Sequence, residues 1–198
     1  ECRRMGRAAS AKWGRRDYLV DTAAGTKFNP YTQMDGVSKE DFLDISAVNV
    51  VGAYQMIRAA EPHLRKSKGA VVNDSSIGGV TGIASSIPYA ASKAALNLMT
   101  KSLAHALAPE IRINTVVPGM IQTRWLQGNM SEEQYENLIE TTAAALPLQK
   151  VAFAEDIAET LVFFLIGPGA RLVTGETLIV DSGIHLGPFP PYASGRPE

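Results

Sequence analysis

The chain has 198 residues, 45% of them hydrophobic, which is enough for one domain with one sizeable core. Its net charge of −1, from 19 basic and 20 acidic residues, gives no reason to expect binding to nucleic acid or to an anionic membrane. The single cysteine, Cys2, cannot form an internal disulfide, and no apolar run is long enough to cross a bilayer, so we expect a soluble, cytoplasmic protein.

Basic side chains are concentrated near the start of the chain, at Arg3, Arg4, Arg7, Lys12, Arg15 and Arg16. No aromatic interleaving and no groove-reading motif accompanies them. Residues 1–16 are therefore expected to be a solvated, poorly ordered segment rather than a functional basic arm. The first residue is Glu1 and not Met, which indicates a processed chain or a piece of a longer one.

Short apolar strands alternate with amphipathic helices along the rest of the chain. The first predicted strand is 17–21 (DYLVD), and after a polar loop a helix follows over 38–64. Ser38 and Asp41 are predicted to cap the start of this helix. Pro62 is expected to end its regular part slightly before residue 64.

The later elements continue the alternation. They are a strand at 70–73 (AVVN), a helix that contains 87–98 and ends near 107, a strand at 111–117 (IRINTVV), helices at 131–145 and 155–166, and a strand at 177–181. Strands separated by helices predict right-handed crossovers and an α/β fold, with helices on both faces of a parallel sheet. The tail 187–198 (GPFPPYASGRPE) has four prolines and is expected to be disordered, or to lie as an arm on a neighbour.

Polar residues and glycines follow three of the predicted strands at the points where the strands end. They are residues 21–25 (DTAAG), residues 74–79 (DSSIGG), and Pro118, Gly119 and Thr123. Ligands of parallel α/β sheets bind beyond the carboxyl ends of the strands. We therefore expect the functional site at this rim.

Tyr89 and Lys93 lie four positions apart in the stretch 87–98 (IPYAASKAALNL). On a helix they share one face, and a nearby ammonium lowers the pKa of a phenol toward the range of a useful general acid or base. Ser76, at the end of the preceding strand, could share a substrate oxygen with Tyr89. Taken alone, the pair is more simply interpreted as a surface tyrosine and lysine on a helix flank.

The pair is accompanied by other segments, in a fixed order over residues 12–186. They are WGRRDYLVDTAAGTKF (13–28), VNVVG (48–52), NDSS (73–76), YAASK (89–93), RINTVVPGMIQT (112–123) and VTGETLIVDSG (173–183). In order and spacing they resemble the short-chain dehydrogenase/reductase family. The resemblance implies a Rossmann-like domain over 17–186 and an NAD(P)-dependent oxidoreductase that interconverts a carbonyl and a secondary alcohol.

The resemblance also implies a catalytic tetrad of Asn49, Ser76, Tyr89 and Lys93. Tyr89 would be the general acid–base, and Ser76 would polarise the substrate oxygen. Lys93 would lower the pKa of Tyr89 and hold the nicotinamide ribose, and Asn49 would support a water-linked proton relay to Lys93. Each residue also has a purely structural interpretation. Ser76 could be a hydroxyl that stabilises a turn, and Asn49 could be a helix-interior amide whose hydrogen bonds are made to the backbone. The implied cofactor-binding residues are Ala23, Ala24, Asn49, Tyr89, Lys93, Pro118, Gly119, Ile121 and Thr123.

The family's glycine-rich turn, T-G-x-x-x-G-x-G, is absent from this sequence. The family strand order 3-2-1-4-5-6-7 would then be reduced to about four strands, with 17–21 at a new edge. Binding of NAD or NADP is expected to be weakened. Asp21 to Ala24 replace the family's Asn-Asn-Ala-Gly, and Asp74 stands where an apolar β-branched residue is usual, so its carboxylate costs energy unless it is paired.

Two functions remain open, the oxidoreductase and a truncated, inactive remnant that only self-associates. The expected partners are a small carbonyl or alcohol substrate and other copies of the chain, as a dimer or tetramer, but neither nucleic acid nor membrane. A hydrolase using Ser76 ranks third, because no G-x-S-x-G elbow is present. The three histidines, His63, His105 and His185, are scattered, so no metal site is expected. Residues 122–146 resemble a mobile lid that would set the substrate.

Overall fold

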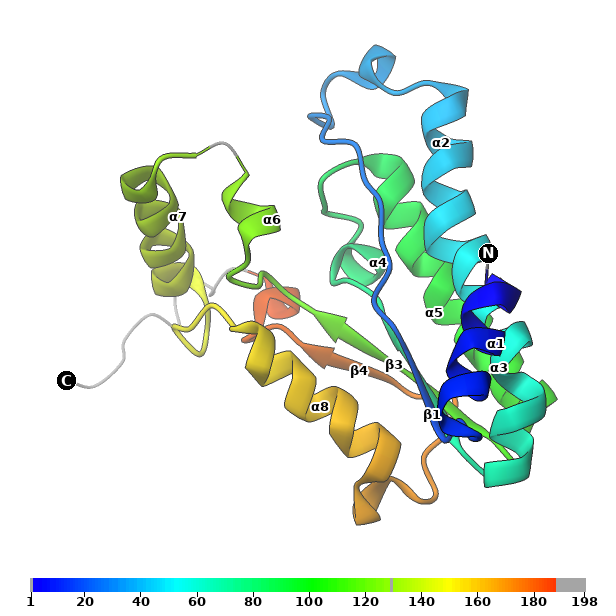
Figure 1. Cartoon of the computed structure of the whole chain (residues 1–198). Helices are drawn as coiled ribbons and strands as arrows, with labels where there is room; N and C mark the ends of the chain where they lie inside the picture. The colour runs from blue at the N-terminus through cyan, green and yellow to red at the C-terminus, as the bar shows by residue number, and fades with distance from the viewer. Residues whose placement is uncertain (1, 129, 188–198) are drawn as a thin grey trace.

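Four parallel strands form one sheet in the order β1-β2-β3-β4 (Figure 1). The computed structural model describes residues 2–128 and 130–187, so the predicted tail beyond Gly187 lies outside the described residues. The strands are β1 (Tyr18–Asp21), β2 (Ala70–Asp74), β3 (Arg112–Pro118) and β4 (Thr177–Val180). The predicted parallel α/β fold with a Rossmann-like sheet is confirmed, and β1 is the edge strand.

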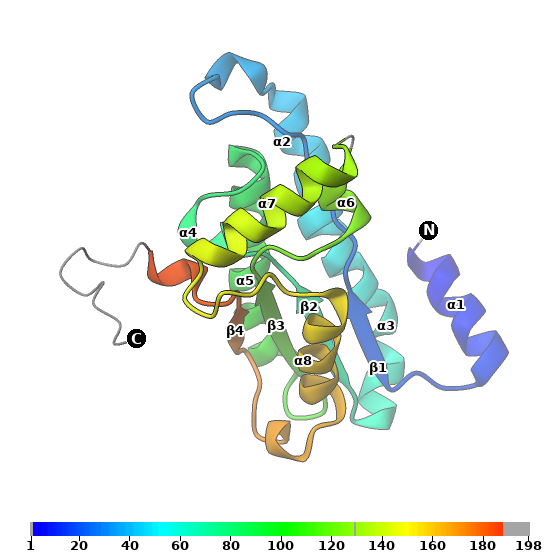
Figure 2. The same cartoon turned by 90° about the vertical axis from the view of Figure 1, so that its left-hand side faces the viewer.

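Helices cover both faces of this sheet. In Figures 1 and 2, α3 (Ala53–Ser67) and α5 (Ile87–Leu107) lie on one face and α8 (Ala154–Ile166) lies on the other. The other helical elements are α1 (Cys2–Trp13), η1 (Met34–Gly36), α2 (Lys39–Ser46), η2 (Ala47–Gly52), α4 (Gly78–Thr81), α6 (Arg124–Gln127), α7 (Glu132–Ala145), η3 (Pro168–Ala170) and η4 (Ile184–Leu186). Within the described ranges, no helix is both long and apolar enough to cross a membrane.

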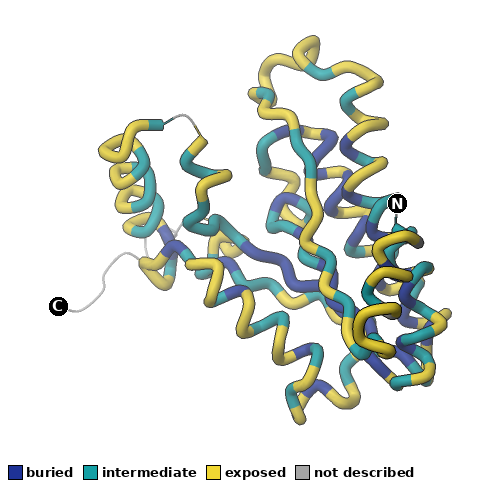
Figure 3. The backbone as a smooth tube through the Cα atoms, viewed as in Figure 1, coloured by how far each residue is buried: buried dark blue, intermediate teal, exposed yellow. Residues whose placement is uncertain are grey.

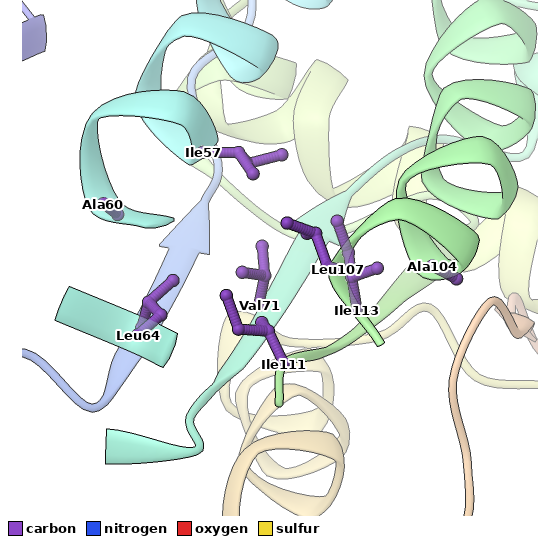
Figure 4. Packing of buried hydrophobic residues seen from close by; sticks show 8 residues of the cluster. All are labelled: Ile57, Ala60, Leu64, Val71, Ala104, Leu107, Ile111 and Ile113. Carbon is purple, nitrogen blue, oxygen red and sulfur yellow. The ribbon is translucent and has the colours of Figure 1, made fainter. Parts of the chain in front are cut away.

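The two faces of the sheet each bury their own apolar cluster. Successive side chains of a strand point to opposite faces, so Val71 packs with α3 and α5, whereas Val72 packs with α8. The first cluster contains Ile57, Ala60, Leu64, Val71, Ala104, Leu107, Ile111 and Ile113 (Figure 4). The central strands β2 and β3 are the most continuously buried part of the chain (Figure 3).

The predicted helix over 38–64 is divided into three parts, α2, the π-helical η2 and α3. Ser38 and Asp41 form the predicted capping box, in which each side chain accepts a hydrogen bond from the other residue's backbone N–H. The prediction that Pro62 ends the regular part early is wrong, because α3 continues to Ser67. Burial of the apolar face of α3, including Leu64, outweighs the hydrogen bond that proline removes.

Helix α1 occupies most of the segment predicted to be poorly ordered. Alanines and basic residues are strong helix formers, and the helix lies against α3 (Figure 1). Just after α1, the Arg16 guanidinium donates a hydrogen bond to the Ala59 carbonyl oxygen of α3 at 3.3 Å and so helps to hold this segment against α3. The sequence reasoning gave weight to the charges of this segment and overlooked its helix propensity.

Buried polar side chains connect the strands to the helices that carry the site. The Thr100 hydroxyl of α5 accepts hydrogen bonds from Asn73 Nδ2 at 2.9 Å and from Thr115 Oγ1 at 2.8 Å. The Arg112 guanidinium donates to three backbone carbonyl oxygens, those of Phe164, Leu165 and Ala170, at 2.8 to 3.0 Å. These bonds hold α5 and α8 in register with β2 and β3.

Candidate active site

A cavity of about 870 Å³ opens beyond the carboxyl ends of β1, β2 and β3. Its walls come from the loop after β1, the end of β2, the first turns of α5 and the segment after β3. This is the rim at which the sequence predicts the site.

Ser76, Tyr89 and Lys93 all line this cavity. Tyr89 and Lys93 are buried, with 9% and 2% of their surfaces exposed, so the alternative of a surface pair on a helix flank is wrong. Lys93 Nζ lies 5.8 Å from the centre of the Tyr89 ring, and the Ser76 side chain is close enough to Tyr89 to lower the pKa of its phenol. Ser76 Oγ also accepts a hydrogen bond from Gly78 N at 3.2 Å, which orients the hydroxyl.

The electrostatic balance at Tyr89 differs from the expected one. Burial raises the pKa of its phenol, the hydrogen bond with Ser76 lowers it, and the negative charge of Asp74 raises it, so that the pKa lies above its ordinary value. The sequence predicts a pKa lowered by Lys93. The pKa of Tyr89 is raised instead, because the phenol is desolvated and the Asp74 carboxylate adds a negative charge near it.

Lys93 is placed near two carboxylates at the ends of neighbouring strands. Burial lowers its pKa and the charges of Asp74 and Asp21 raise it, but burial has the larger effect, so the pKa lies below its ordinary value. Its Nζ donates to the backbone carbonyl oxygen of Asp74 at 2.8 Å. The charge of Lys93 thus offsets part of the energetic cost of burying the Asp74 carboxylate, while its hydrogen bond goes to the Asp74 backbone.

The Asp74 carboxyl is itself strongly perturbed. Its pKa is raised to about 6 as the net result of three causes: burial raises it, the charge of Lys93 lowers it, and the charge of Asp21 raises it. Its Oδ1 atom is buried and has no hydrogen-bond partner among the described residues. The pKa of Asp21 is also raised, mainly by burial.

Asn49 does not line the cavity with the other three predicted catalytic residues. Its side chain is buried in η2, where Oδ1 accepts from Gly25 N at 2.8 Å and Nδ2 donates to Gly25 O at 3.0 Å and to Ser92 Oγ at 2.9 Å. The Ser92 hydroxyl donates in turn to the backbone oxygen of Tyr89 at 2.7 Å. The hydrogen bonds of the Asn49 amide thus match the structural interpretation of this residue. They fix the turn after β1 against α5.

Most of the predicted cofactor-binding residues lie in the cavity wall. Ala24, Pro118, Gly119, Ile121 and Thr123 line it together with Tyr89 and Lys93, whereas Ala23 and Asn49 do not. The Thr123 side chain also caps α6, because its hydroxyl oxygen accepts from Leu126 N at 3.3 Å.

Sequence reasoning missed three aromatic residues of the wall, Phe28, Tyr31 and Trp125. They come from loops and from a four-residue helix, where no periodicity identifies them. The sequence did offer one signal for two of them, because Phe28 and Trp125 each follow shortly after the end of a predicted strand. No group of three or more His, Cys, Asp or Glu side chains in the described part of the chain could hold a metal ion.

Comparison with known proteins gives the class of this fold and site. A family model described as Enoyl-(Acyl carrier protein) reductase matches residues 1–185. The short-chain dehydrogenase/reductase homolog YusR of Bacillus subtilis is 46% identical over 136 residues, which are 68% of this chain and 98% of that protein. The 7alpha-hydroxysteroid dehydrogenase of Clostridium sardiniense is 34% identical over 187 residues, 93% of this chain and 69% of that protein.

A solved structure gives the same result. ElxO with NADP bound has a TM-score of 0.81 and 30% identity to this chain, and the match covers 93% of this chain and 73% of that one. The fold and the matches therefore define a dehydrogenase or reductase. The chain belongs to the short-chain dehydrogenase/reductase family, as the resemblance predicts, and is an oxidoreductase by family.

Proposed function

We propose that this chain interconverts a carbonyl compound and a secondary alcohol with NAD or NADP as the hydride carrier, and that Tyr89 is the general acid–base. The observation that best supports this proposal is the convergence of Ser76, Tyr89 and Lys93 in one cavity at the carboxyl ends of the strands. The dehydrogenases and reductases among its relatives, and the NADP bound to ElxO, are consistent with it.

The cavity suits the nicotinamide end of such a cofactor. Pro118, Gly119 and Ile121 offer an apolar surface to a flat ring. An ammonium has three N–H donors, and Lys93 uses one on the Asp74 backbone oxygen, so it can also bind ribose hydroxyls. The 198 residues contain no T-G-x-x-x-G-x-G turn for the pyrophosphate, so we expect weak cofactor affinity from this chain alone.

In the proposed reduction, the cofactor supplies a hydride to the carbonyl carbon when it is bound. Tyr89 donates its hydroxyl proton to the carbonyl oxygen, and Ser76 donates a hydrogen bond to the same oxygen. Ser76 Oγ accepts from Gly78 N through a lone pair, and a serine hydroxyl that accepts in this way still has one O–H to donate. The positive charge of Lys93 stabilises the phenolate that remains on Tyr89, which regains a proton from solvent. In oxidation, the phenolate accepts the proton of the alcohol.

Substitution of Tyr89 tests this assignment. Tyr89→Phe is expected to lower the rate of carbonyl reduction by at least about 100-fold, since general acid catalysis contributes that much, while the affinity for NADH or NADPH, measured by fluorescence, is retained. Tyr54→Phe is the matched control, because Tyr54 lies on exposed α3 surface outside the cavity. Unchanged turnover in Tyr89→Phe would contradict the proposal.

Self-association is the second part of the proposal and needs no catalysis. Large apolar side chains on α2 to α3 are exposed, among them Leu43 (57%) and Val51 (52%), and Leu98 on α5 is 67% exposed. We expect these helices to form a dimer or tetramer interface, which sedimentation would detect. Self-association without any cofactor binding would favour the inactive remnant.

A further inference from the structure

Two exposed aromatic rings meet at the mouth of the cavity. Phe28 and Trp125 are 66% and 58% exposed, and their ring centres lie 5.5 Å apart with an interplanar angle of 39°. Both line the cavity, but Phe28 belongs to the loop after β1 and Trp125 to α6. Large apolar surface left in water beside a cavity is typical of a place where an apolar ligand becomes buried.

The wall that carries Phe28 is held firmly in place. The Tyr31 hydroxyl donates to Gly82 O and accepts from Ala84 N, both at 2.8 Å. Asn29 N donates to Ser85 O at 2.9 Å. These bonds join the loop after β1 to the loop between α4 and α5, so Phe28 is presented by a braced surface.

The opposite side of the aromatic contact is a short element. Helix α6 has four residues and is anchored at its start by the Thr123 cap. Separation of Phe28 from Trp125 therefore requires displacement of a small segment and not of the sheet. Movement of this short segment is the step by which an apolar ring would enter between the two aromatic rings.

The charges of the cavity exclude some substrates. Among the described residues that line it, the charged side chains are Asp74 and Lys93, which interact with each other. Arg124 is next to Trp125 in sequence but is not part of the lining. Among the described lining residues Lys93 is the one cation, and it is 2% exposed, beside Tyr89, whereas an uncharged apolar ring would find Ile83, Leu126 and the two aromatic rings.

We propose that the substrate is an uncharged, apolar ring ketone, or the corresponding secondary alcohol, bound between Phe28 and Trp125 with its oxygen directed to Tyr89 and Ser76. This inference rests on the proposed function for its chemistry, but the binding site does not depend on turnover. It can therefore be tested by binding alone.

Trp125 supplies the readout. The chain has two tryptophans, so Trp13→Phe, on the exposed surface of α1, leaves Trp125 as the single reporter. The probe is 2-decalone, an apolar bicyclic ketone, with dihydroxyacetone and acetoacetate as polar and charged comparisons. Each is titrated with and without NADP+, and turnover of each ketone is measured separately as the oxidation of added NADPH. We expect a saturable change in Trp125 fluorescence with 2-decalone and none with the other two.

Further variants in the Trp13→Phe background locate the site. Phe28→Ala is expected to weaken 2-decalone binding about tenfold, because an aromatic face is lost, and Phe28→Tyr should restore it. Leu172→Ala is the control, since Leu172 is 98% exposed and lies outside the cavity. Binding that is unaffected by Phe28→Ala would overturn the inference.

The result separates this inference from the proposed function. Saturable binding of 2-decalone without turnover would support the apolar site and count against the oxidoreductase chemistry. Turnover of dihydroxyacetone or acetoacetate without 2-decalone binding would keep the chemistry and overturn the apolar site. Absence of both responses would overturn the inference as well.

Discussion

Asp74 should make this protein less stable at neutral pH than at acidic pH. In the unfolded chain its carboxyl has the ordinary pKa of 3.8, and burial raises the pKa to about 6 in the fold. The folded state therefore holds the proton at a pH where the unfolded state has released it. The resulting stabilisation is complete below the unfolded pKa and is lost as the pH rises through the folded one.

The expected effect is about 3 kcal/mol, because a change of one pKa unit corresponds to about 1.4 kcal/mol and the pKa rises by about two. Asp74→Asn removes the buried charge but keeps the size of the side chain. The free energy of unfolding of the variant should thus exceed that of the wild type by up to about 3 kcal/mol at pH 7.5, and the advantage should nearly disappear at pH 4. The raised pKa of Asp21 is caused mainly by burial and not by Asp74, so the difference between variant and wild type is expected to isolate Asp74.

Urea unfolding at a series of pH values, followed by circular dichroism, measures this difference. Asp44→Asn is the matched control. Asp44 lies on the exposed surface of α2, and its substitution removes the same formal charge. A difference between Asp74→Asn and the wild type that stays constant from pH 4 to pH 7.5 would refute the reasoning.

Three further predictions concern the site and its supports. The Asp74 charge raises the pKa of Tyr89, so in Asp74→Asn the rise of alcohol oxidation with pH, measured as kcat/KM, should move to lower pH. Asn49→Ala removes bonds to both backbone groups of Gly25 and should lower the free energy of unfolding in urea by about 2 kcal/mol; an unchanged value would mean that solvent replaces the amide. Arg112→Lys retains the charge but cannot reach three carbonyl oxygens in the same geometry, so a loss of about 2 kcal/mol is expected by thermal unfolding, and no loss would show that charge alone suffices.

The elements that the sequence predicts best are those whose signal is local. The runs 70–73 and 111–117 are short and rich in β-branched residues, and both form central strands, β2 and β3. The cap at Ser38 is equally local, because it depends on a residue three positions away. The end of α3 is different: Pro62 opposes the helix locally, but packing against the sheet decides the outcome.

The candidate site divides in the same way. Tyr89 and Lys93 could be paired from sequence because a helix fixes which residues share a face, and Ser76 could be added because it follows a strand. The contact between Phe28 and Trp125 depends on where two loops lie in space, which no spacing encodes. The direction of the Asn49 side chain is likewise a tertiary property, since a π-helical turn carries it toward Gly25.

The carboxylate at Asp74 has a consequence for the direction of the proposed reaction. With a raised pKa, Tyr89 keeps its proton at neutral pH and so begins the cycle as an acid, which is the state that carbonyl reduction requires. The phenolate that follows would be repelled by a charged Asp74, but a carboxyl with a pKa of about 6 lies close enough to neutrality for that new negative charge to favour its protonation. Lys93, whose pKa is raised by the charges of Asp74 and Asp21, would then meet a nearly constant amount of negative charge through the cycle. We therefore expect reduction near neutral pH to be the direction to which this arrangement of charges is best suited.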